Sequence, residues 1–532
     1  MGANTISVAS TPAAGAAAAS PRARILDFAQ ARPTTAFAVF TVAHTLAWTL
    51  VLTVAAKSLP LDMIEGVAYG RDWQIGYWKH PPLPWLLLDG VHRLFGGQIW
   101  AFYLLCQLQV AAAFWAIWRL GREILSPAAA LAAVVLLDAD IVFNLKSAPF
   151  NHNTAQLALF SLAGLSLFLA FKRGLLRDWL CVGLWFALAF YAKYEAVVLA
   201  APAVLFAVAD PVARRCWRTP GPYIASAVFL LLLAPELAWL TLSVKFAPLI
   251  YAGDKAPTAA TLSGLLATSA NFVLTAALYI LPVLGLFLTL ALRSWATPPA
   301  PTDPSDAFAR RYLAALAFGP LAVSVAAGLL THREMGGAWV MQFWCFISLF
   351  LMAMWRPTVD RPAVRRLAVG WAGLTVLFVV IKLVGEVFLI APGKLIETQF
   401  SGEEFSAAVT RAWRREEPGR PLPYLIGEFW TAGNVMLFSP EHPRLLESGD
   451  PVHSPRIDLT DVRRRGAVIL FAPVVRLNAA PIAKTGAPWL AAYPTAEARK
   501  PFIIRRRTVR GDVEWAVGWA ILKPQDPPLV VR

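Results

Sequence analysis

Apolar runs dominate this 532-residue chain from residue 36 to residue 391, and most of them are close to the roughly 20 residues that cross a bilayer as a helix. Hydrophobic residues make up 58% of the chain and charged residues only 15%, which excludes an ordinary soluble protein. The runs lie at 36–56, 98–120, 127–144, 155–172, 178–192, 193–209, 221–243, 264–292, 310–329, 336–355 and 365–391. We therefore predict an all-α polytopic membrane protein with about eleven transmembrane helices, give or take about two. The count varies because three runs are short and because 178–209 reads as one long helix, a half-helix or two tilted helices.

The basic residues alternate from one side of the predicted membrane to the other. Every second connection is basic, as cytoplasmic loops are. These connections contain Arg119 and Arg122; Lys172, Arg173 and Arg177; Arg214, Arg215 and Arg218; Arg293, Arg310 and Arg311; and Arg356, Arg361, Arg365 and Arg366. The net charge of +15 therefore reflects topology, and we predict no nucleic-acid partner.

Composition divides the chain into three parts. Residues 1–30 are rich in Ala, Ser and Pro and are predicted to be a disordered cytoplasmic tail, followed by a transmembrane domain at 31–391. Residues 392–532 combine strand-like pieces such as "GAVILFAP" and "EWAVGWAIL" with a charged helix-like stretch, "EEFSAAVTRAWRREE". We predict a small α/β domain on the outer face, which either covers the membrane part or takes part in substrate binding.

The first outer connection carries two acids directly after the first span. Asp62 and Glu65 are three residues apart, so on a helical turn they share one face at the membrane surface. A carboxylate in a partly apolar cleft has the raised pKa that suits a general base. Two solvated surface acids are the simpler alternative.

The segment "GYWKHPPLPW" follows the acids in the same connection. Pro81, Pro82 and Pro84 oppose a regular helix, while its Trp residues are typical of the membrane interface. We expect interfacial helices in this connection, separated by a rigid aromatic loop that suits an amphiphilic substrate with an acyl or isoprenoid tail. Membrane anchoring alone explains the Trp residues, but it explains Lys79 and His80 less well.

Four motifs together resemble a known group of membrane enzymes. The acid pair in "LDMIE", then "GYWKHPPLPWLL", "FNHNT" after the third span and "AKYEA" two spans later are similar to the GT-C polyprenyl-phosphate-dependent glycosyltransferases. More closely, the chain resembles the branch with the aminoarabinose–lipid A transferases, the rhizobial galacturonosyltransferases and, more distantly, the protein O-mannosyltransferases. It covers roughly residues 36–390 and, loosely, the C-terminal part.

The resemblance implies an inverting transfer of a sugar from a polyprenyl-phosphate donor to an acceptor hydroxyl. The reaction would take place at the periplasmic face of the bacterial inner membrane, on lipid A, lipopolysaccharide core or another envelope glycan or lipid. Asp62 matches the base that takes the acceptor proton, and Glu65 would assist it or hold a divalent cation. Many relatives carry adjacent acids, so the separation seen here leaves the roles of the two residues open. No cofactor is certain, since the sequence has no HExxH or paired-Cys spacing.

Phosphate as a leaving group needs cations around it, and sugar hydroxyls need neutral donors and acceptors. The predicted outer connections supply both kinds of residue. Candidates for binding the donor phosphate and sugar are Tyr77, Lys79, His80, Asn151, His152, Lys193, Tyr194, Glu195, His332 and Arg333.

Three of these assignments have plain structural alternatives. A contact between Lys193 and Glu195 explains that pair equally well, and helix capping by Asn153 or Thr154 explains the "NHNT" segment equally well. A polar turn explains 332–334 better than binding does.

Two other functions fit parts of the pattern. A flippase or transporter of lipid-linked sugars also spans many times, but it places polar groups near the bilayer midplane and has repeated halves, which this chain lacks. A cytoplasmic nucleotide-sugar enzyme needs acids in the basic loops, where Asp210 and Asp360 are poorly placed and no Gly-rich phosphate loop is present.

Overall fold

The structure is a computed structural model of the whole chain, and it describes most of the residues. The described residues are 31–243, 245–291, 304–388, 396–471, 474–475, 479–508 and 511–525. The predicted tail at 1–30 lies outside them, as does the end of the last predicted span.

Seven described helices are long and apolar enough to cross a membrane. They are α2 (Pro33–Ala55), α5 (Ile99–Ile124), α7 (His152–Arg173), α10 (Gly221–Leu242), α12 (Leu262–Ala291), α13 (Pro304–Thr331) and α15 (Arg361–Leu383). Their outward faces carry exposed side chains such as Leu46, Leu231 and Val369, which only a lipid environment accommodates in such numbers. The chain is thus a mostly helical polytopic membrane protein.

Each of the four remaining predicted runs contains a shorter helix. These are α6 (Pro127–Leu137), α8 (Leu176–Ala192), α9 (Val197–Ala209) and α14 (Ile347–Trp355). The stretch 178–209 is two helices, separated by an extended residue at Lys193. A total of eleven crossings remains a prediction, because it counts these short helices as spans.

Two predicted runs are helical over only part of their length. In 127–144, helix α6 ends at Leu137, because the Asn144 side chain bonds the Asp138 carbonyl and Asp140 starts a short 3₁₀ turn at Ile141–Phe143. In 336–355, only α14 is α-helical, and a 3₁₀ turn at Gly337–Val340 precedes it. Side chains that compete for backbone groups end the helix in the first case although hydropathy favours its continuation.

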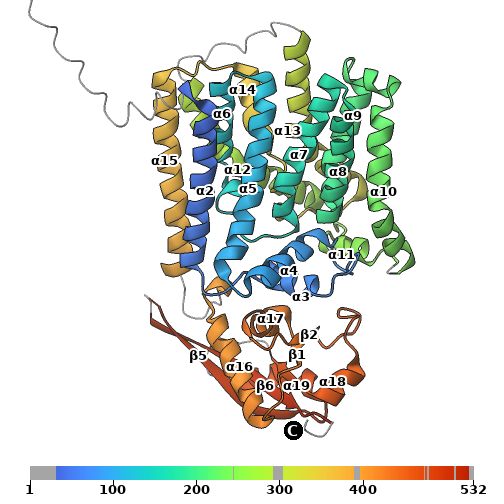
Figure 1. Cartoon of the computed structure of the whole chain (residues 1–532), viewed down its shortest axis with the longest axis vertical. Helices are drawn as coiled ribbons and strands as arrows, with labels where there is room; N and C mark the ends of the chain where they lie inside the picture. The colour runs from blue at the N-terminus through green and yellow to red at the C-terminus, as the bar shows by residue number, and fades with distance from the viewer. Residues whose placement is uncertain are drawn as a thin grey trace, which may run out of the picture.

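Short helices lie between the helical layer and the C-terminal part, as Figure 1 shows. They are α3 (Leu61–Gly70), α4 (Leu83–Phe95) and α11 (Ala247–Lys255). Pro84 does not break a helix, as the sequence suggested, but occupies the first turn of α4, where its missing N–H costs nothing. Between Leu61 and Phe95, the irregular backbone is the loop between α3 and α4.

The C-terminal part is an α/β domain with one mixed sheet. Strands β1 (Tyr424–Gly427), β2 (Arg444–Glu447), β3 (Ala467–Leu470), β4 (Val474–Val475), β5 (Glu497–Thr508) and β6 (Gly511–Leu522) form it in the order β2-β1-β3-β6-β4, and β5 also pairs with β6. Strand β1 is parallel to β2 and β3, and β6 is antiparallel to its neighbours. Helices α16 (Gly402–Glu416), α17 (Phe429–Phe438), α18 (Leu459–Arg465) and α19 (Ala479–Ala492) complete it.

This domain docks on α3 through buried contacts. The Ser58 hydroxyl donates to Asn434 Oδ1 of α17 at 2.5 Å, and Glu397 Oε2 accepts the Leu61 N–H at the start of α3 at 2.9 Å. Gly433 of α17 lies against Ile64 so closely that a Cβ would be 2.3 Å from a side-chain methyl. The domain therefore fixes the helix that carries both acids of the first connection.

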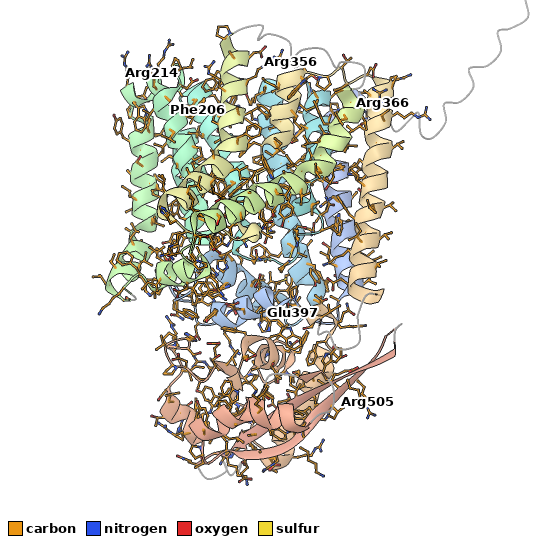
Figure 2. The ribbon with its side chains drawn as sticks, turned by 180° about the vertical axis from the view of Figure 1, so that it is seen from behind. Phe206, Arg214, Arg356, Arg366, Glu397 and Arg505 are labelled. Carbon is orange, nitrogen blue, oxygen red and sulfur yellow. The ribbon has the colours of Figure 1, made fainter. Side chains whose placement is uncertain are left out.

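The predicted basic connections gather on one end of the helical layer. Figure 2 shows Arg214, Arg356 and Arg366 at the end opposite the sheet, while Glu397 and Arg505 lie on the sheet side. This separation matches the alternation read from the sequence. We call the arginine-bearing end the basic face.

Candidate active site

A cavity of about 710 Å³ opens at the end of the helical layer that faces the C-terminal domain. Residues from α3, the α3–α4 loop, the start of α7, the α8–α9 break, α11 and the loop after α13 line it. Ten of the twelve residues predicted for the site lie there: Asp62, Glu65, Lys79, His80, Asn151, His152, Lys193, Tyr194, Glu195 and Arg333. The fold thus brings together motifs that are about 270 residues apart in the sequence.

The two acids have different surroundings. Asp62 is exposed to the cavity, and its Oδ2 accepts a hydrogen bond of 2.8 Å from Asn151 Nδ2. Glu65 is buried, and its Oε1 lies 2.6 Å from Lys79 Nζ. Burial raises the pKa of Glu65, while the Lys79 ammonium opposes that shift. Asp62 is therefore the accessible carboxylate and Glu65 the partner of a cation.

Asn151 connects the acid to the first turn of α7. Its Oδ1 accepts the N–H groups of Asn153 and Thr154, and the Thr154 hydroxyl accepts the Asn151 N–H in return. This capping box leaves the amide nitrogen of Asn151 free to donate to Asp62. Capping therefore falls to Asn151 with Thr154, and not to Asn153, which the sequence offered as a capping residue.

Two histidines, His80 and His152, line the cavity next to each other. The rings of His80 and His152 are 4.2 Å apart, and Trp85 meets both rings edge-on. His152 Nε2 is 3.1 Å from the Pro81 carbonyl, so this ring holds the proline loop in place. Burial lowers the pKa of His80, which makes its neutral form the stable one.

Lys193 occupies the break between α8 and α9. Its ammonium bonds Asn153 Oδ1 at 2.6 Å, forms an ion pair with Glu195 and lies 5.8 Å from the centre of the Trp339 ring. The structural contact with Glu195 therefore exists, and both residues still line the cavity. The break in the helix is what brings this charge to the cavity wall.

Tyr194, the next residue, also lines the cavity and is anchored from within α10. Its hydroxyl donates to Glu236 Oε1, and Glu236 is fully buried. Because the single hydroxyl proton is committed to Glu236, the Tyr194 oxygen can only accept a hydrogen bond from a ligand. Glu236 is not among the residues predicted from the sequence, although an acid within an apolar span is a recognised signal.

Helix α11 adds two residues that sequence reasoning missed. Tyr251 and Lys255 line the cavity, and the Tyr251 ring lies 5.5 Å from Lys79 Nζ and 5.4 Å from Lys255 Nζ. The available signal was the segment "KFAPLIYAGDK", which lies between the predicted runs 221–243 and 264–292, in a connection that alternates with the basic ones. Tyr251 therefore stands between two ammonium groups at the cavity.

Arg333 lines the cavity, but its guanidinium is engaged by the backbone. Arg333 Nη1 donates to the carbonyls of Gly253 and Ala256, each at 2.9 Å, and so fastens the loop after α13 to α11. His332 lies outside the cavity in a left-handed turn with φ of 54°. For His332 the structure agrees with the polar turn and gives no support for binding.

Tyr77 also lies outside the cavity. Its ring packs between Tyr69 and Trp85, and its hydroxyl accepts the Gln74 N–H at 3.2 Å. The side chain is only 2% exposed. Tyr77 supports the α3–α4 loop from behind, so its predicted contact with the donor has no geometric support.

The acids do not form a convincing site for a divalent cation. Among the described residues, no group of three or more His, Cys, Asp or Glu side chains has the geometry to hold a metal ion. Glu65 already faces the Lys79 ammonium, and Asp62 accepts an amide proton, so a metal would have to displace both. We therefore assign no step of the chemistry to a metal.

The C-terminal domain touches the α3–α4 loop next to Lys79. His453 stacks on Trp78 at 4.1 Å between ring centres, and Glu447 holds its Nδ1 at 2.5 Å. Trp78 in turn donates to the Tyr69 hydroxyl at 2.7 Å. No described residue of this domain lines the cavity itself, so the domain acts on the site through this loop.

Residues 79–239 match the model of the dolichyl-phosphate-mannose-protein mannosyltransferase family. This similarity to a glycosyltransferase family covers 161 of the 532 residues. The matched segment begins at Lys79 and contains the cavity residues contributed by α7 and by the α8–α9 break, whereas Asp62 and Glu65 precede it. No curated protein sequence matches the chain significantly.

Solved structures with a loosely similar architecture include two bacterial proteins. The apo crystal structure of ArnT from Cupriavidus metallidurans is 14% identical, with a TM-score of 0.45, over 93% of this chain and 100% of that chain. Arabinofuranosyltransferase AftD from Mycobacteria is 15% identical, with a TM-score of 0.46, over 92% of this chain. The match spans only 40% of AftD.

Proposed function

We propose that this protein is a glycosyltransferase that transfers a sugar from a polyprenyl-phosphate donor to a hydroxyl of an envelope acceptor, with inversion at the anomeric carbon. The observation that carries the proposal is the cavity, in which an accessible carboxylate, Asp62, faces the same space as the ammonium groups of Lys79, Lys193 and Lys255. A base and a set of cations are what this reaction requires from a protein.

In the proposed reaction the acceptor oxygen attacks the anomeric carbon while the bond from that carbon to the phosphate oxygen breaks. Asp62 takes the proton from the acceptor hydroxyl, and polyprenyl phosphate leaves with the bonding electrons. Asn151 holds the Asp62 carboxylate in one orientation through its amide hydrogen bond. This hydrogen bond keeps the base directed at the cavity before substrates arrive.

The leaving phosphate gains negative charge as the bond breaks, and ammonium groups already in place stabilise it without reorganisation. Glu65 keeps Lys79 at the cavity wall, and Asn153 together with Glu195 does the same for Lys193. Glu65 is thus assigned to positioning and Asp62 to proton transfer. We propose this division of roles for the two acids, which the sequence left open.

We further propose a bacterial inner membrane with the cavity on its periplasmic side, at the end opposite the basic face. The residues from 392 onward then form a periplasmic domain over the transmembrane domain at 31–391. The positions of Arg214, Arg356 and Arg366 in Figure 2 support this orientation. The acceptor is proposed to be lipid A, lipopolysaccharide core or another envelope glycan or lipid.

The test is a transfer assay with the purified full-length protein in lipid. A panel of radiolabelled polyprenyl-phosphate sugars is offered together with a total envelope-lipid extract. We expect one donor to be consumed and its label to appear in a lipid or glycan product, and we expect Asp62→Asn to abolish this while remaining folded. Consumption of no donor across the panel would contradict the proposal and favour a flippase.

A further inference from the structure

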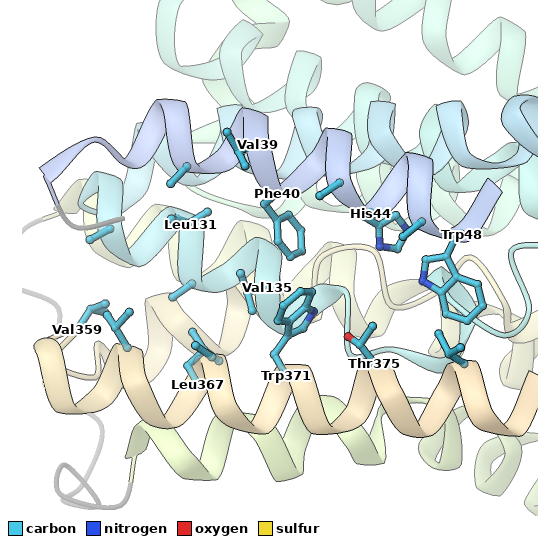
Figure 3. Close-up of a pocket in the computed structure, with 18 residues that line it drawn as sticks. Val39, Phe40, His44, Trp48, Leu131, Val135, Val359, Leu367, Trp371 and Thr375 are labelled. Atoms are coloured by element: carbon cyan, nitrogen blue, oxygen red, sulfur yellow. The ribbon is translucent and has the colours of Figure 1, made fainter. Parts of the chain in front are cut away.

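A second cavity lies far from the proposed active site, between α2, α6 and α15 (Figure 3). Its volume is about 460 Å³, which is within the usual range for small-molecule sites. Phe40, His44 and Trp48 of α2 project toward Trp371 and Thr375 of α15. Apart from His44, Trp371 and Thr375 its lining is almost entirely aliphatic and aromatic carbon. We call this cavity the α2–α15 groove.

The groove follows from the sequence of the three helices. Along α2 its lining residues recur at three- and four-residue spacing, and the small side chains Ala36, Ala43 and Ala47 leave the space open. The lining of α6 and α15 has the same period. The faces of three helices thus line the α2–α15 groove, and their side chains do not fill it.

A polar network keeps the groove open. The Asp138 carboxylate, which is buried, lies 2.9 Å from His44 Nδ1 of α2 and accepts the indole N–H of Trp371 of α15 at 2.6 Å. One side chain therefore ties α2 and α15 at a fixed separation. The groove is a preformed feature rather than a gap that the helices can close.

The length of the groove corresponds to one leaflet. From Ala36 to Trp48, twelve helical steps give about 18 Å, compared with about 15 Å for half of the hydrocarbon core. The end of the groove at Ala36 lies at the basic face, where α2 and α15 begin (Figures 1 and 2). The groove therefore lies in the leaflet opposite the proposed active site.

The end of the groove at the basic face is positively charged. Arg32 is one turn before the lining residue Ala36 of α2. Arg361 and Arg365 lie in the first two turns of α15, before and after the lining residue Val364. The acid next to Arg361 in sequence is Asp360, and its carboxylate caps α15 by accepting the Ala363 N–H at 2.8 Å. The balance of these side chains is cationic, which suits an anionic headgroup.

We propose that the α2–α15 groove binds one acyl chain of an anionic glycerophospholipid from the leaflet at the basic face, with its phosphate at Arg32, Arg361 and Arg365. The acyl chain of the lipid fills the space that side chains leave open in the groove. The phosphate of its headgroup contacts the arginines. The bound lipid then acts as a packing element that joins α2 to α15. This site is separate from the proposed transfer reaction.

The test uses the full-length protein in phosphatidylcholine nanodiscs that contain phosphatidylglycerol with a diazirine on one acyl chain. After irradiation, mass spectrometry locates the labelled peptides. We expect labelling to concentrate on α2, α6 and α15 and to fall about tenfold in Ala43→Phe, which fills the groove. Leu46→Phe on the outward face of α2 is the matched control and should label like the wild type.

The headgroup is tested with a second pair of variants. Arg365→Gln should reduce the preference for the phosphatidylglycerol probe over a phosphatidylcholine probe about fivefold. Arg366→Gln should not, because Arg366 donates to the Thr289 carbonyl of α12. Size-exclusion profiles check folding, and Ala43→Leu replaces Ala43→Phe if that variant aggregates.

Equal labelling of all lipid-facing helices would overturn the proposal. So would equal labelling in Ala43→Phe and Leu46→Phe, or displacement of the probe by polyprenyl phosphate rather than by unlabelled phosphatidylglycerol.

Discussion

Lys79 Nζ lies 2.6 Å from Glu65 Oε1, and both side chains are largely withdrawn from solvent. The exposed Asp62 carboxylate is one helical turn from Glu65 on α3, and it has an amide partner instead of a cation. Two acids of the same helix thus differ in burial and in the charge of their partner, and distinct phenotypes follow from this difference.

Asp62→Asn should lower kcat for sugar transfer by about 10² to 10⁴, because it removes the proposed base while keeping a side chain of the same size. The melting temperature should change little, since Asp62 is exposed. Asp72→Asn is a suitable control: Asp72 is an acid outside the cavity that pairs with Arg444. Equal activity in Asp62→Asn and Asp72→Asn would remove Asp62 from the mechanism.

Lys79→Met should destabilise the protein by about 3–5 kcal/mol, because it leaves the buried Glu65 carboxylate without a partner. Adding Glu65→Gln should restore most of the stability but not the transfer activity, since the cation is still absent. Thermal unfolding and steady-state kinetics of the two single variants and the double variant complete the cycle. If the double variant is no more stable than Lys79→Met, Lys79 stabilises the protein through contacts other than the one with Glu65.

The elevated pKa of Glu65 gives stability a defined pH dependence. Because the folded state holds this proton more tightly than the unfolded state, the contribution of Glu65 to stability is greatest below pH 4.5 and declines as pH rises through the folded pKa. Glu65→Gln does not titrate at this position. The melting temperature of the variant should therefore increase relative to that of the wild type as pH rises over this window. A constant difference between the two proteins would contradict the burial effect.

Lys255→Met should raise KM for the polyprenyl-phosphate donor about tenfold or more with a smaller change in kcat, because one charge-assisted contact to the phosphate is lost. Lys245→Met serves as the control, since Lys245 is an exposed lysine outside the cavity near the start of α11. Initial rates at varied donor concentration separate the two parameters. If both variants change KM equally, only the net charge of the surface matters.

His453→Ala should reduce kcat about two- to tenfold by releasing Trp78, because an aromatic stack contributes about 0.5–1.5 kcal/mol. His453→Phe keeps the ring and should recover most of the rate. A merely structural residue would change stability without this recovery in kcat. The comparison therefore asks whether the C-terminal domain positions the α3–α4 loop.

Local patterns predicted the helices and most of the cavity residues well. Every predicted apolar run contains a helix, and the strand-like pieces at 466–473 and 514–522 became β3 and β6, because these signals depend on periodicity within one segment. Strand β2 was missed because its four residues, Arg444–Glu447, show no clear alternation. The described helices also show where hydropathy overestimates length, as at the end of α6.

Tertiary contacts account for what the sequence did not reveal. Tyr251 reaches the cavity because Arg333 fastens α11 to the loop after α13, a pairing of residues about 80 positions apart. Glu236 of α10 affects the cavity through Tyr194, which lies 42 positions earlier in the turn between α8 and α9. Tyr77 was misplaced because an interfacial aromatic residue and a buried one look alike in sequence.

The capping box of α7 has a mechanical consequence. Asn151 fixes the first turn of a membrane span with its oxygen and holds the Asp62 carboxylate with its nitrogen. Axial displacement of α7 is therefore transmitted directly to the proposed base. Because spans adjust their tilt and depth to the hydrocarbon thickness of the host bilayer, the rate of sugar transfer should vary with the acyl-chain length of the surrounding lipid.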